Sequence, residues 1–390
     1  MKRIFYILLL LILFLNLLSC VNKREETILL SSKGNFLILD ENLVVLKKIN
    51  KNLNGKVFIN EVKGDLVLFN LQNSDPFKSG IFLLNLKDEK LINVTKDIEG
   101  LFLYKPKFYD NENILFSVRD KNANENLYIY SLKSGSFKII SKDIKSSYIY
   151  PFYIDNINKK IYIKLLKVDE DNPKISLYDL NKDDFFENYI TLTSQIFMTE
   201  PNEKGEFILI NYDSKTNKET IQIVDFNRKI FKEIYSRIDG HIYDINFFDY
   251  SDNILFKYIS NSDENNSSIV IIDRDGNLIK EIPSPFVGEF YILNTKLNQI
   301  YIMAQEKDDS KYNLYSFNID NQNIKKLSNN DKYFGGDLII SKTKKMLIIS
   351  ESNYNLINKD YLIMNIDGTK KESIIKKLNI DLIDSIIFLK

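Results

Sequence analysis

The sequence is poor in the residues that mark disulfide scaffolds, metal sites and nucleotide-binding loops. Its 390 residues include one cysteine, one histidine, no tryptophan and 13 glycines. The single cysteine, Cys20, excludes an intramolecular disulfide, and the single histidine, His241, excludes a metal site built from several imidazoles. No two glycines stand four or five residues apart. The sequence therefore contains neither a Gly-x-Ser-x-Gly nucleophile elbow nor a phosphate-binding loop.

An excess of charge of one sign is also absent. Lys and Arg number 53, and Asp and Glu number 53, so the formal net charge at pH 7 is zero. Nucleic-acid-binding domains usually carry a clear basic excess, and we predict no nucleic-acid partner. Carboxylates are abundant, but no pair stands out, and His241 begins a predicted strand after Gly240, which favours a structural role. We identify no catalytic residue, no metal site and no cofactor, and predict that the protein is not an enzyme.

The sequence does contain a repeated, strand-like segment of seven residues. Its clearest copy is Asn126-Leu-Tyr-Ile-Tyr-Ser-Leu132, in which a polar start is followed by apolar and aromatic residues and a small polar residue stands sixth. Neighbouring copies are 45 to 48 residues apart, and they begin at Asn35, Gly80, Asn126, Lys174, Thr220, Ser268, Asn313 and Asp360. A steady period of this length is typical of repeat architectures.

Each period contains four short apolar runs separated by turn residues. In one period the runs lie at 105–109, 114–118, 126–132 and 137–141. Four strands in a period of this length are the pattern of a β-propeller blade. The sixth residue of the repeated segment, an Asp or Asn in most copies, is interpreted as a turn residue whose side chain accepts a backbone hydrogen bond. Further blades are predicted at 57–95, 149–193, 197–235, 242–282, 290–327 and 338–378.

The two ends of the chain complement each other. Three predicted strands, at 28–30, 35–39 and 43–49, precede the first full blade, and a single strand, at 384–389, follows the last. Pairing them completes one blade and hides the edges that an open stack would expose. We therefore predict an all-β fold over 27–390, an eight-bladed β-propeller of four-stranded antiparallel blades closed by a C-terminal strand joining the N-terminal blade. A seven-bladed ring with one irregular repeat is the alternative.

The N-terminal segment has the features of a lipoprotein signal. Met1-Lys2-Arg3 is basic, 4–18 is almost wholly apolar, and Ser19 precedes Cys20. This resembles the lipobox of bacterial lipoproteins, and the resemblance implies cleavage between Ser19 and Cys20 and lipidation of the Cys20 thiol. The apolar run is short for a membrane span. We predict that 1–19 is a signal peptide, that 20–26 is a lipidated tether, and that the lipid anchors the protein to a membrane.

Aromatic residues near the blade connections are the candidate partner-binding residues. Loops between second and third strands are long and polar in most predicted blades, and they lie on the same face as the connections between blades. Binding surfaces favour such loops on a rigid frame. Two interpretations of these aromatics stay open, a partner-contact ring, since tyrosine is enriched at interfaces, and ordinary packing. The residues are Tyr104, Tyr150, Phe152 and Tyr243.

Two resemblances bear on function. The segment Lys105-Pro-Lys-Phe…Ile114-Leu-Phe…Asn126-Leu-Tyr-Ile-Tyr…Ser134-Gly135 resembles the WD40-like repeat of TolB-type propellers. The overall plan, eight blades behind a lipobox, resembles BamB-type lipoproteins, which scaffold outer-membrane β-barrel assembly, although blades of that type are rich in the tryptophan that this chain lacks. Both resemblances imply a non-catalytic interaction platform of the bacterial envelope.

The expected function is therefore a non-catalytic envelope lipoprotein, located at the outer membrane, that scaffolds envelope proteins. Two alternatives remain, because a fold does not determine a function. One is a ligand-binding or hydrolytic propeller, for which a deep pocket with clustered carboxylates would be the evidence. The other is a surface-exposed adhesin.

Overall fold

A computed structural model describes most of the chain after the predicted tether. Among the described residues, no helix is long and apolar enough to cross a membrane. The predicted lipobox with Ser19 and Cys20 lies outside the described residues, and so does Tyr104. The described part is 26–389 without the internal segments 75–78, 99, 101–105, 121, 142–143, 145, 168–173, 191–194, 203, 227–229, 249–252, 262, 287–288, 297–298, 306–311, 329–331, 342, 344 and 353–358.

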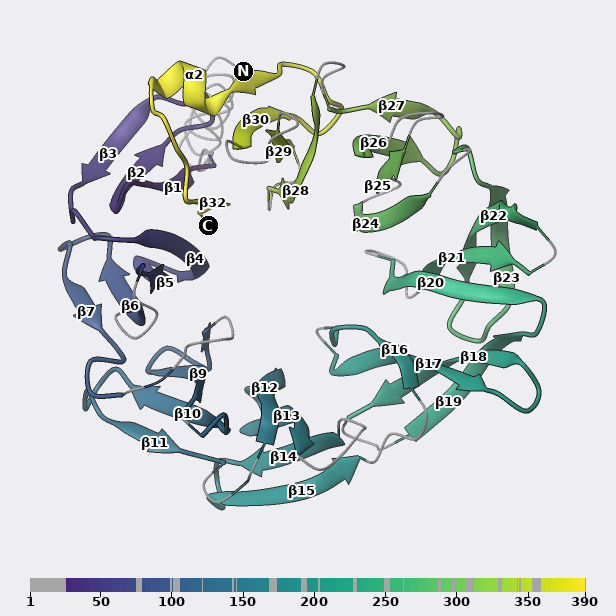
Figure 1. The fold of residues 1–390 in the computed structure, drawn as a ribbon, viewed down its shortest axis with the longest axis horizontal. Helices are drawn as coiled ribbons and strands as arrows, with labels where there is room; N and C mark the ends of the chain where they lie inside the picture. The colour runs from purple at the N-terminus through teal and green to yellow at the C-terminus, as the bar shows by residue number, and fades with distance from the viewer. Residues whose placement is uncertain are drawn as a thin grey trace, which may run out of the picture.

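Eight four-stranded antiparallel sheets form a ring of blades (Figure 1). Blade 1 holds β1 (Ile28–Ser32), β2 (Asn35–Leu39), β3 (Val45–Ile49) and β32 (Ser385–Phe388). Blades 2 to 4 hold β4 (Lys56–Lys63), β5 (Leu66–Gln72), β6 (Gly80–Asn85), β7 (Leu91–Asn93), β8 (Lys107–Phe108), β9 (Asn113–Arg119), β10 (Glu125–Ser131), β11 (Phe137–Ile139), β12 (Ser146–Asp155), β13 (Lys160–Lys167), β14 (Lys174–Asp179) and β15 (Asp184–Ile190).

The second half of the ring continues the same order. Blades 5 to 8 hold β16 (Gln195–Met198), β17 (Glu206–Asp213), β18 (Lys218–Asp225), β19 (Ile230–Arg237), β20 (Gly240–Phe247), β21 (Ile254–Ser260), β22 (Asp263–Ile272), β23 (Leu278–Pro283), β24 (Phe290–Lys296), β25 (Gln299–Gln305), β26 (Tyr312–Asn318), β27 (Ile324–Lys326), β28 (Tyr333–Ile340), β29 (Met346–Ser352), β30 (Lys359–Asn365) and β31 (Glu372–Ser373). Strands such as β12, β20 and β24 face the centre of the ring, whereas β11, β15 and β19 lie at its periphery (Figure 1). The predicted eight-bladed propeller is confirmed, and the seven-bladed alternative is excluded.

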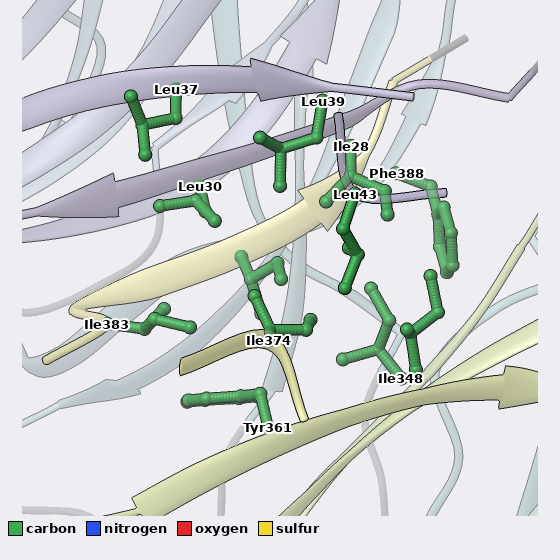
Figure 2. Packing of buried hydrophobic residues seen from close by; sticks show 12 residues of the cluster. Ile28, Leu30, Leu37, Leu39, Leu43, Ile348, Tyr361, Ile374, Ile383 and Phe388 are labelled. Atoms are coloured by element: carbon green, nitrogen blue, oxygen red, sulfur yellow. The ribbon is translucent and has the colours of Figure 1, made fainter. Parts of the chain in front are cut away.

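The ring closes through β32. This C-terminal strand pairs antiparallel with β1, with Ile386 opposite Leu30 and Phe388 opposite Ile28. Figure 2 shows the apolar cluster that the closure buries, in which these chain-end residues pack against Ile348 of blade 8. The closing blade therefore joins both ends of the chain as predicted, and its seam forms part of the hydrophobic core.

Side chains at recurring positions explain why each repeat folds alike. The sixth residue of the repeated segment forms the predicted turn, since Asn85 Oδ1 accepts the amide of Lys87 at 2.9 Å and Asp273 Oδ1 accepts that of Asp275 at 2.8 Å. A second recurring feature was not predicted. The backbone amide of the second residue of the segment donates to the hydroxyl of a Ser or Thr that follows 14 residues later. The hydroxyls are those of Thr95, Ser141 and Ser328. Both interactions provide a hydrogen-bond acceptor for a backbone amide of the repeat.

Aromatic residues fill the spaces between blades. Between blades 4 and 5, Tyr162 lies 4.3 Å from Phe226 between ring centroids, and Phe207 lies 5.0 Å from the same ring. All three side chains are fully buried. Burying such a ring contributes about 2 kcal/mol, so stacked Phe and Tyr rings supply the packing that tryptophan provides in many propellers. Because neighbouring blades cover both faces of each sheet, β14 is buried continuously from Ile175 to Asp179 and not at alternate residues.

Blade 8 departs from the predicted pattern at its outer strand. Its fourth strand is only β31, and the chain then forms a single helical turn, α2 (Ile374–Leu378). Ser373 caps this helix by accepting the amide of Lys376 at 3.2 Å, which is the usual role of serine at such a position. Ile374 is fully buried in the closure cluster. No helical periodicity is visible in this part of the sequence, because one turn is too short to show it.

Candidate functional site

A pocket lies at the seam where the two ends of the chain meet, between blades 8, 1 and 2. Its volume is about 420 Å³, which is in the range of sites for small organic ligands. We call it the closure pocket. Apolar walls come from Phe58 and from isoleucines of β28 and β32, and the polar lining residues are Lys56, Asn60, Asp337, Lys359, Tyr361, Asp384 and Ser385.

A bulge in the inner strand of blade 8 places Asp337 in this pocket. The pairing of β28 with β29 is interrupted between Phe334 and Leu338. Gly336 has a φ of +98°, and a Cβ on Gly335 would lie 2.8 Å from Ser350 Oγ. The amide of Asp337 donates to that oxygen at 2.9 Å. Bulges of this kind commonly redirect a side chain beside a functional site, and only glycine fits this one.

Asp337 and Tyr361 form the hydrogen-bonded centre of the pocket. Lys359 Nζ lies 3.0 Å from Asp337 Oδ2, and the Tyr361 hydroxyl donates to the same oxygen at 3.2 Å. Burial, with the charges of Asp337 and Asp384 nearby, raises the pKa of the Tyr361 phenol. Tyr361 therefore stays protonated and remains a donor at neutral pH.

Asp384 brings a second carboxyl with unused hydrogen-bonding capacity. Its Oδ2 atom is buried and has no hydrogen-bond partner among the residues that the structure describes. Burial raises the pKa of this carboxyl, and the positive charge of Lys56 and nearby backbone amides oppose the rise only in part. Buried polar atoms are normally satisfied, so Asp384 is suited to accept a hydrogen bond from a ligand amine or amide.

Replacing Asp384 with asparagine is expected to raise the free energy of unfolding at neutral pH. The folded-state pKa of the carboxyl lies above its ordinary value of 3.8. The folded protein therefore binds the proton more tightly than the unfolded chain, and stability is lost as pH rises through this window. Urea unfolding followed by circular dichroism should show a larger gain at about pH 7 than at about pH 3. A gain that grows toward low pH would contradict the assignment.

A second cluster of polar side chains lies between the inner ends of blades 6 and 7. We call it the tyrosine box, formed by Tyr243, Lys257, Glu289, Tyr291 and Tyr312. Glu289 Oε2 accepts hydrogen bonds from the hydroxyls of Tyr312 at 2.7 Å and Tyr291 at 3.2 Å. These bonds lower the pKa of the Glu289 carboxyl. Lys257 is buried beneath the rings, with Nζ 5.4 Å from the Tyr291 centroid and 5.8 Å from that of Tyr243.

His241 is held by a buried carboxylate at the same edge of the ring. Its Nδ1 lies 2.9 Å from Glu219 Oε1, and Glu219 Oε2 accepts the amide of Ile242 at 2.6 Å. Glu125 accepts the amide of Ile149 at 3.1 Å in the same way two blades earlier. Because the arrangement recurs without a histidine, it serves first to join neighbouring blades, in agreement with the structural role expected of His241.

The four aromatic residues proposed to bind partners differ in how far the structure describes them and in how exposed they are. Tyr104 lies outside the described residues, and for Tyr150 only its place in β12 is described. Phe152 is 4% exposed and packs edge-on against Phe207 and Phe226, at 5.4 and 5.7 Å between centroids. Tyr243 is 46% exposed. Packing therefore accounts for Phe152, whereas Tyr243 presents its ring to solvent, and partner binding by these residues stays a prediction.

Sequence reasoning did not find the closure pocket. Its polar residues come from β4, β28 and β30 and from the segment entering β32, so no short motif holds them. One signal was present, because Gly335 and Gly336 are the only adjacent glycines in the sequence and immediately precede Asp337. Among the described residues, no group of three or more His, Cys, Asp or Glu side chains could hold a metal ion. The prediction of a protein without a cofactor remains a prediction.

Comparison with known proteins finds the fold in several peptidases. No protein-family model and no curated protein sequence matches the chain. Dipeptidyl peptidase 4 of Porphyromonas gingivalis matches 91% of this chain with a TM-score of 0.59 at 12% identity, and the match covers 59% of that chain. A prolyl endopeptidase matches 93% with a TM-score of 0.53 at 11% identity, covering 61% of that chain. The chain thus spans about three fifths of these peptidases.

A third match covers a propeller studied by itself. The β-propeller domain of the Trilobed protease from Pyrococcus furiosus matches 83% of this chain and 96% of that one, with a TM-score of 0.53 at 12% identity. That domain is described as having an open velcro topology, whereas β1 and β32 close the ring here. At these identities the similarity establishes the propeller fold.

These comparisons correct the prediction that the protein is not an enzyme. That prediction was based on missing sequence motifs and on resemblances to non-catalytic platforms. The matching structures named above are instead peptidases or part of one, in which a propeller belongs to a hydrolytic protein. The expected TolB-type and BamB-type likeness is not shown by the comparisons.

Proposed function

We propose that this propeller binds peptides for hydrolysis, with the closure pocket as the binding site. The observation that carries the proposal is the convergence of two carboxyls, two lysines and a tyrosine hydroxyl on one pocket of about 420 Å³ that also has apolar walls. The peptidase propellers support the peptide as ligand. Two carboxyls in one pocket are part of the evidence expected of a ligand-binding or hydrolytic propeller, which was a deep pocket with clustered carboxylates.

The chemistry of the pocket suits a short peptide. Asp384 Oδ2 has acceptor capacity for an ammonium group or an amide N–H. Lys56 and Lys359 bring positive charge that a terminal carboxylate can meet, although Lys359 is shared with Asp337 at 3.0 Å. Phe58 and Ile386 supply apolar walls for a side chain. Charge-assisted hydrogen bonds of this type are stronger than neutral ones, so unblocked peptides should bind best.

Removing the Asp337 charge is expected to weaken peptide binding. Asp337→Asn keeps the size of the side chain but loses the anion that holds Lys359 and Tyr361 in place. Calorimetric titration with unblocked tripeptides should show about a tenfold higher Kd, because a charge-assisted hydrogen bond contributes roughly 1.5–3 kcal/mol. Mass spectrometry of the same mixtures tests whether the purified chain cleaves the peptide.

The matched control is Asp381→Asn. Asp381 lies close in sequence to β32, but it is exposed and pairs with Lys33 at the surface at 2.6 Å. This variant should bind peptides like the unmodified protein. The proposal is contradicted if unblocked tripeptides do not bind the unmodified protein, or if Asp337→Asn and Asp381→Asn bind them equally.

The location of the protein forms a further part of the proposal. The lipobox resemblance supports a bacterial envelope protein anchored to the membrane through lipid on Cys20, with envelope proteins as partners. Residues 1–25 are outside the described part of the chain. The anchor and the partners therefore stay predictions that rest on the sequence.

A further inference from the structure

The tyrosine box has the composition of a site for an organic cation. Tyr243 is 46% exposed and Tyr291 is 37% exposed, and both stand on the innermost strands of their blades, β20 and β24. The Tyr291 and Tyr312 rings lie 5.9 Å apart between centroids at an angle of 56°. Aromatic faces attract cations, and a rigid pair of rings loses little conformational entropy on binding.

Only one of the two oxygens of the Glu289 carboxylate accepts hydrogen bonds within the described part of the chain. Both tyrosine hydroxyls donate to Glu289 Oε2. Within the described part of the chain, no hydrogen bond or ion pair reaches Oε1 of Glu289, which lies on an exposed residue. An ionised carboxylate can accept several hydrogen bonds. One oxygen is thus fixed by the protein while the other is directed to solvent beside two aromatic rings.

The nearby lysine does not satisfy this carboxylate. Lys257 Nζ donates to the Phe290 carbonyl at 2.7 Å and stacks on the Phe290 ring at 4.5 Å. The residue is 6% exposed, and burial lowers the pKa of its ammonium group. Asp244 and Glu289 both lie close enough to oppose that shift, and Asp244 accepts the amide of Ile292 at 3.0 Å. Lys257 therefore supports the rings from below, and the Glu289 carboxylate is the exposed anion of the box.

We propose that the tyrosine box binds the guanidinium or ammonium group of a basic peptide side chain, between the exposed tyrosine rings and Glu289 Oε1. That the cation belongs to a peptide rests on the function proposed above, whereas binding of the cation itself does not. The box lies on blades 6 and 7, apart from the closure pocket on blades 8, 1 and 2. It selects basic ligands independently of the closure pocket.

The test uses arginine amide as the probe and citrulline amide as its uncharged counterpart. Titration followed by tyrosine fluorescence and by calorimetry should show that arginine amide binds the unmodified protein at least tenfold more tightly than citrulline amide. Glu289→Gln should raise the Kd for arginine amide about tenfold and reduce its salt dependence. Tyr291→Leu should weaken binding about fivefold, while Tyr291→Phe, which keeps the ring, should have a smaller effect.

Two control variants separate this proposal from the closure pocket and from loss of fold. Glu233→Gln removes an exposed carboxylate that pairs with Lys218 at 3.0 Å elsewhere on the surface, and it should bind arginine amide normally. Asp337→Asn should also bind it normally, even if peptide binding in the closure pocket fails. Equal binding of the two amides, an unchanged Kd in Glu289→Gln with an unchanged melting temperature, or preference for an anionic probe such as glutamate would each overturn the proposal.

Discussion

Replacing Ile386 with aspartate is expected to open the ring and destabilise the whole propeller. Ile386 is 6% exposed and pairs with Leu30 in the strand pair that joins the two ends of the described chain. Its side chain belongs to the closure cluster with Ile28, Ile383 and Phe388 (Figure 2). The substitution removes apolar packing and buries a charge, so we expect a loss of more than about 4 kcal/mol. That is a large part of the usual 5–15 kcal/mol of stability.

Urea unfolding and limited proteolysis measure this effect. The variant should unfold at much lower urea than the unmodified protein, and protease should remove the C-terminal strand first. Asp381→Asn serves as the control, because Asp381 is exposed and its pairing with Lys33 is at the surface. A change within about 0.5 kcal/mol is expected there. If Ile386→Asp unfolds at the same urea concentration as the control, the closure contributes nothing to stability and the account of the ring is wrong.

Removing the carboxylate of Glu125 is the second substitution with a large expected effect. Glu125 is fully buried, accepts the Ile149 amide of the next blade at 3.1 Å, and forms an ion pair with Arg119. Glu125→Ala leaves the amide without its acceptor and the guanidinium without this anion. Leaving a buried backbone amide without its acceptor costs about 1–3 kcal/mol, and the ion pair adds less because the Arg119 side chain is 36% exposed. The contact between blades 3 and 4 should therefore weaken.

A graded series checks the physical cause. Glu125→Gln keeps an oxygen for the Ile149 amide but loses the charge that faces Arg119, and its stability should fall between those of alanine and glutamate. Glu233→Ala removes the exposed partner of Lys218 and should cost less than about 1 kcal/mol. Thermal and urea unfolding of all three variants provide the comparison. Equal destabilisation by Glu125→Ala and Glu233→Ala would show that the burial of Glu125 is unimportant.

The sequence predicted the architecture because the repeat depends on local interactions. Asn85 and Asp273 accept backbone amides two residues ahead, and such contacts leave the same signature in each copy. The four apolar runs per period and the incomplete ends also follow from strand lengths and turn residues. The outer end of blade 8 was missed, because α2 replaces most of a strand with one helical turn.

The same sequence could not distinguish aromatic residues that look alike at the blade connections. Phe152 and Tyr243 both stand on inner strands. Phe152 is buried by Phe207 and Phe226 of the next blade, whereas Tyr243 lies over Lys257 and remains exposed. The orientation of two neighbouring blades decides which side chains cover an aromatic ring. A local sequence pattern does not predict that orientation.

By itself the sequence determined the four-stranded repeat, its strand order and the joining of the chain ends, because periodic apolar runs and turn residues are local features of the chain. It predicted eight blades, and the structure excluded the alternative of seven. Only the tertiary structure decided which side chains meet. The bulge at Gly336 turns Asp337 toward Tyr361, and ring closure brings Asp384 beside them from the far end of the chain. Likewise Glu289, which precedes β24, accepts a hydrogen bond from Tyr312 at the start of β26. These sites form where separate strands converge, and convergence is a property of packing in three dimensions.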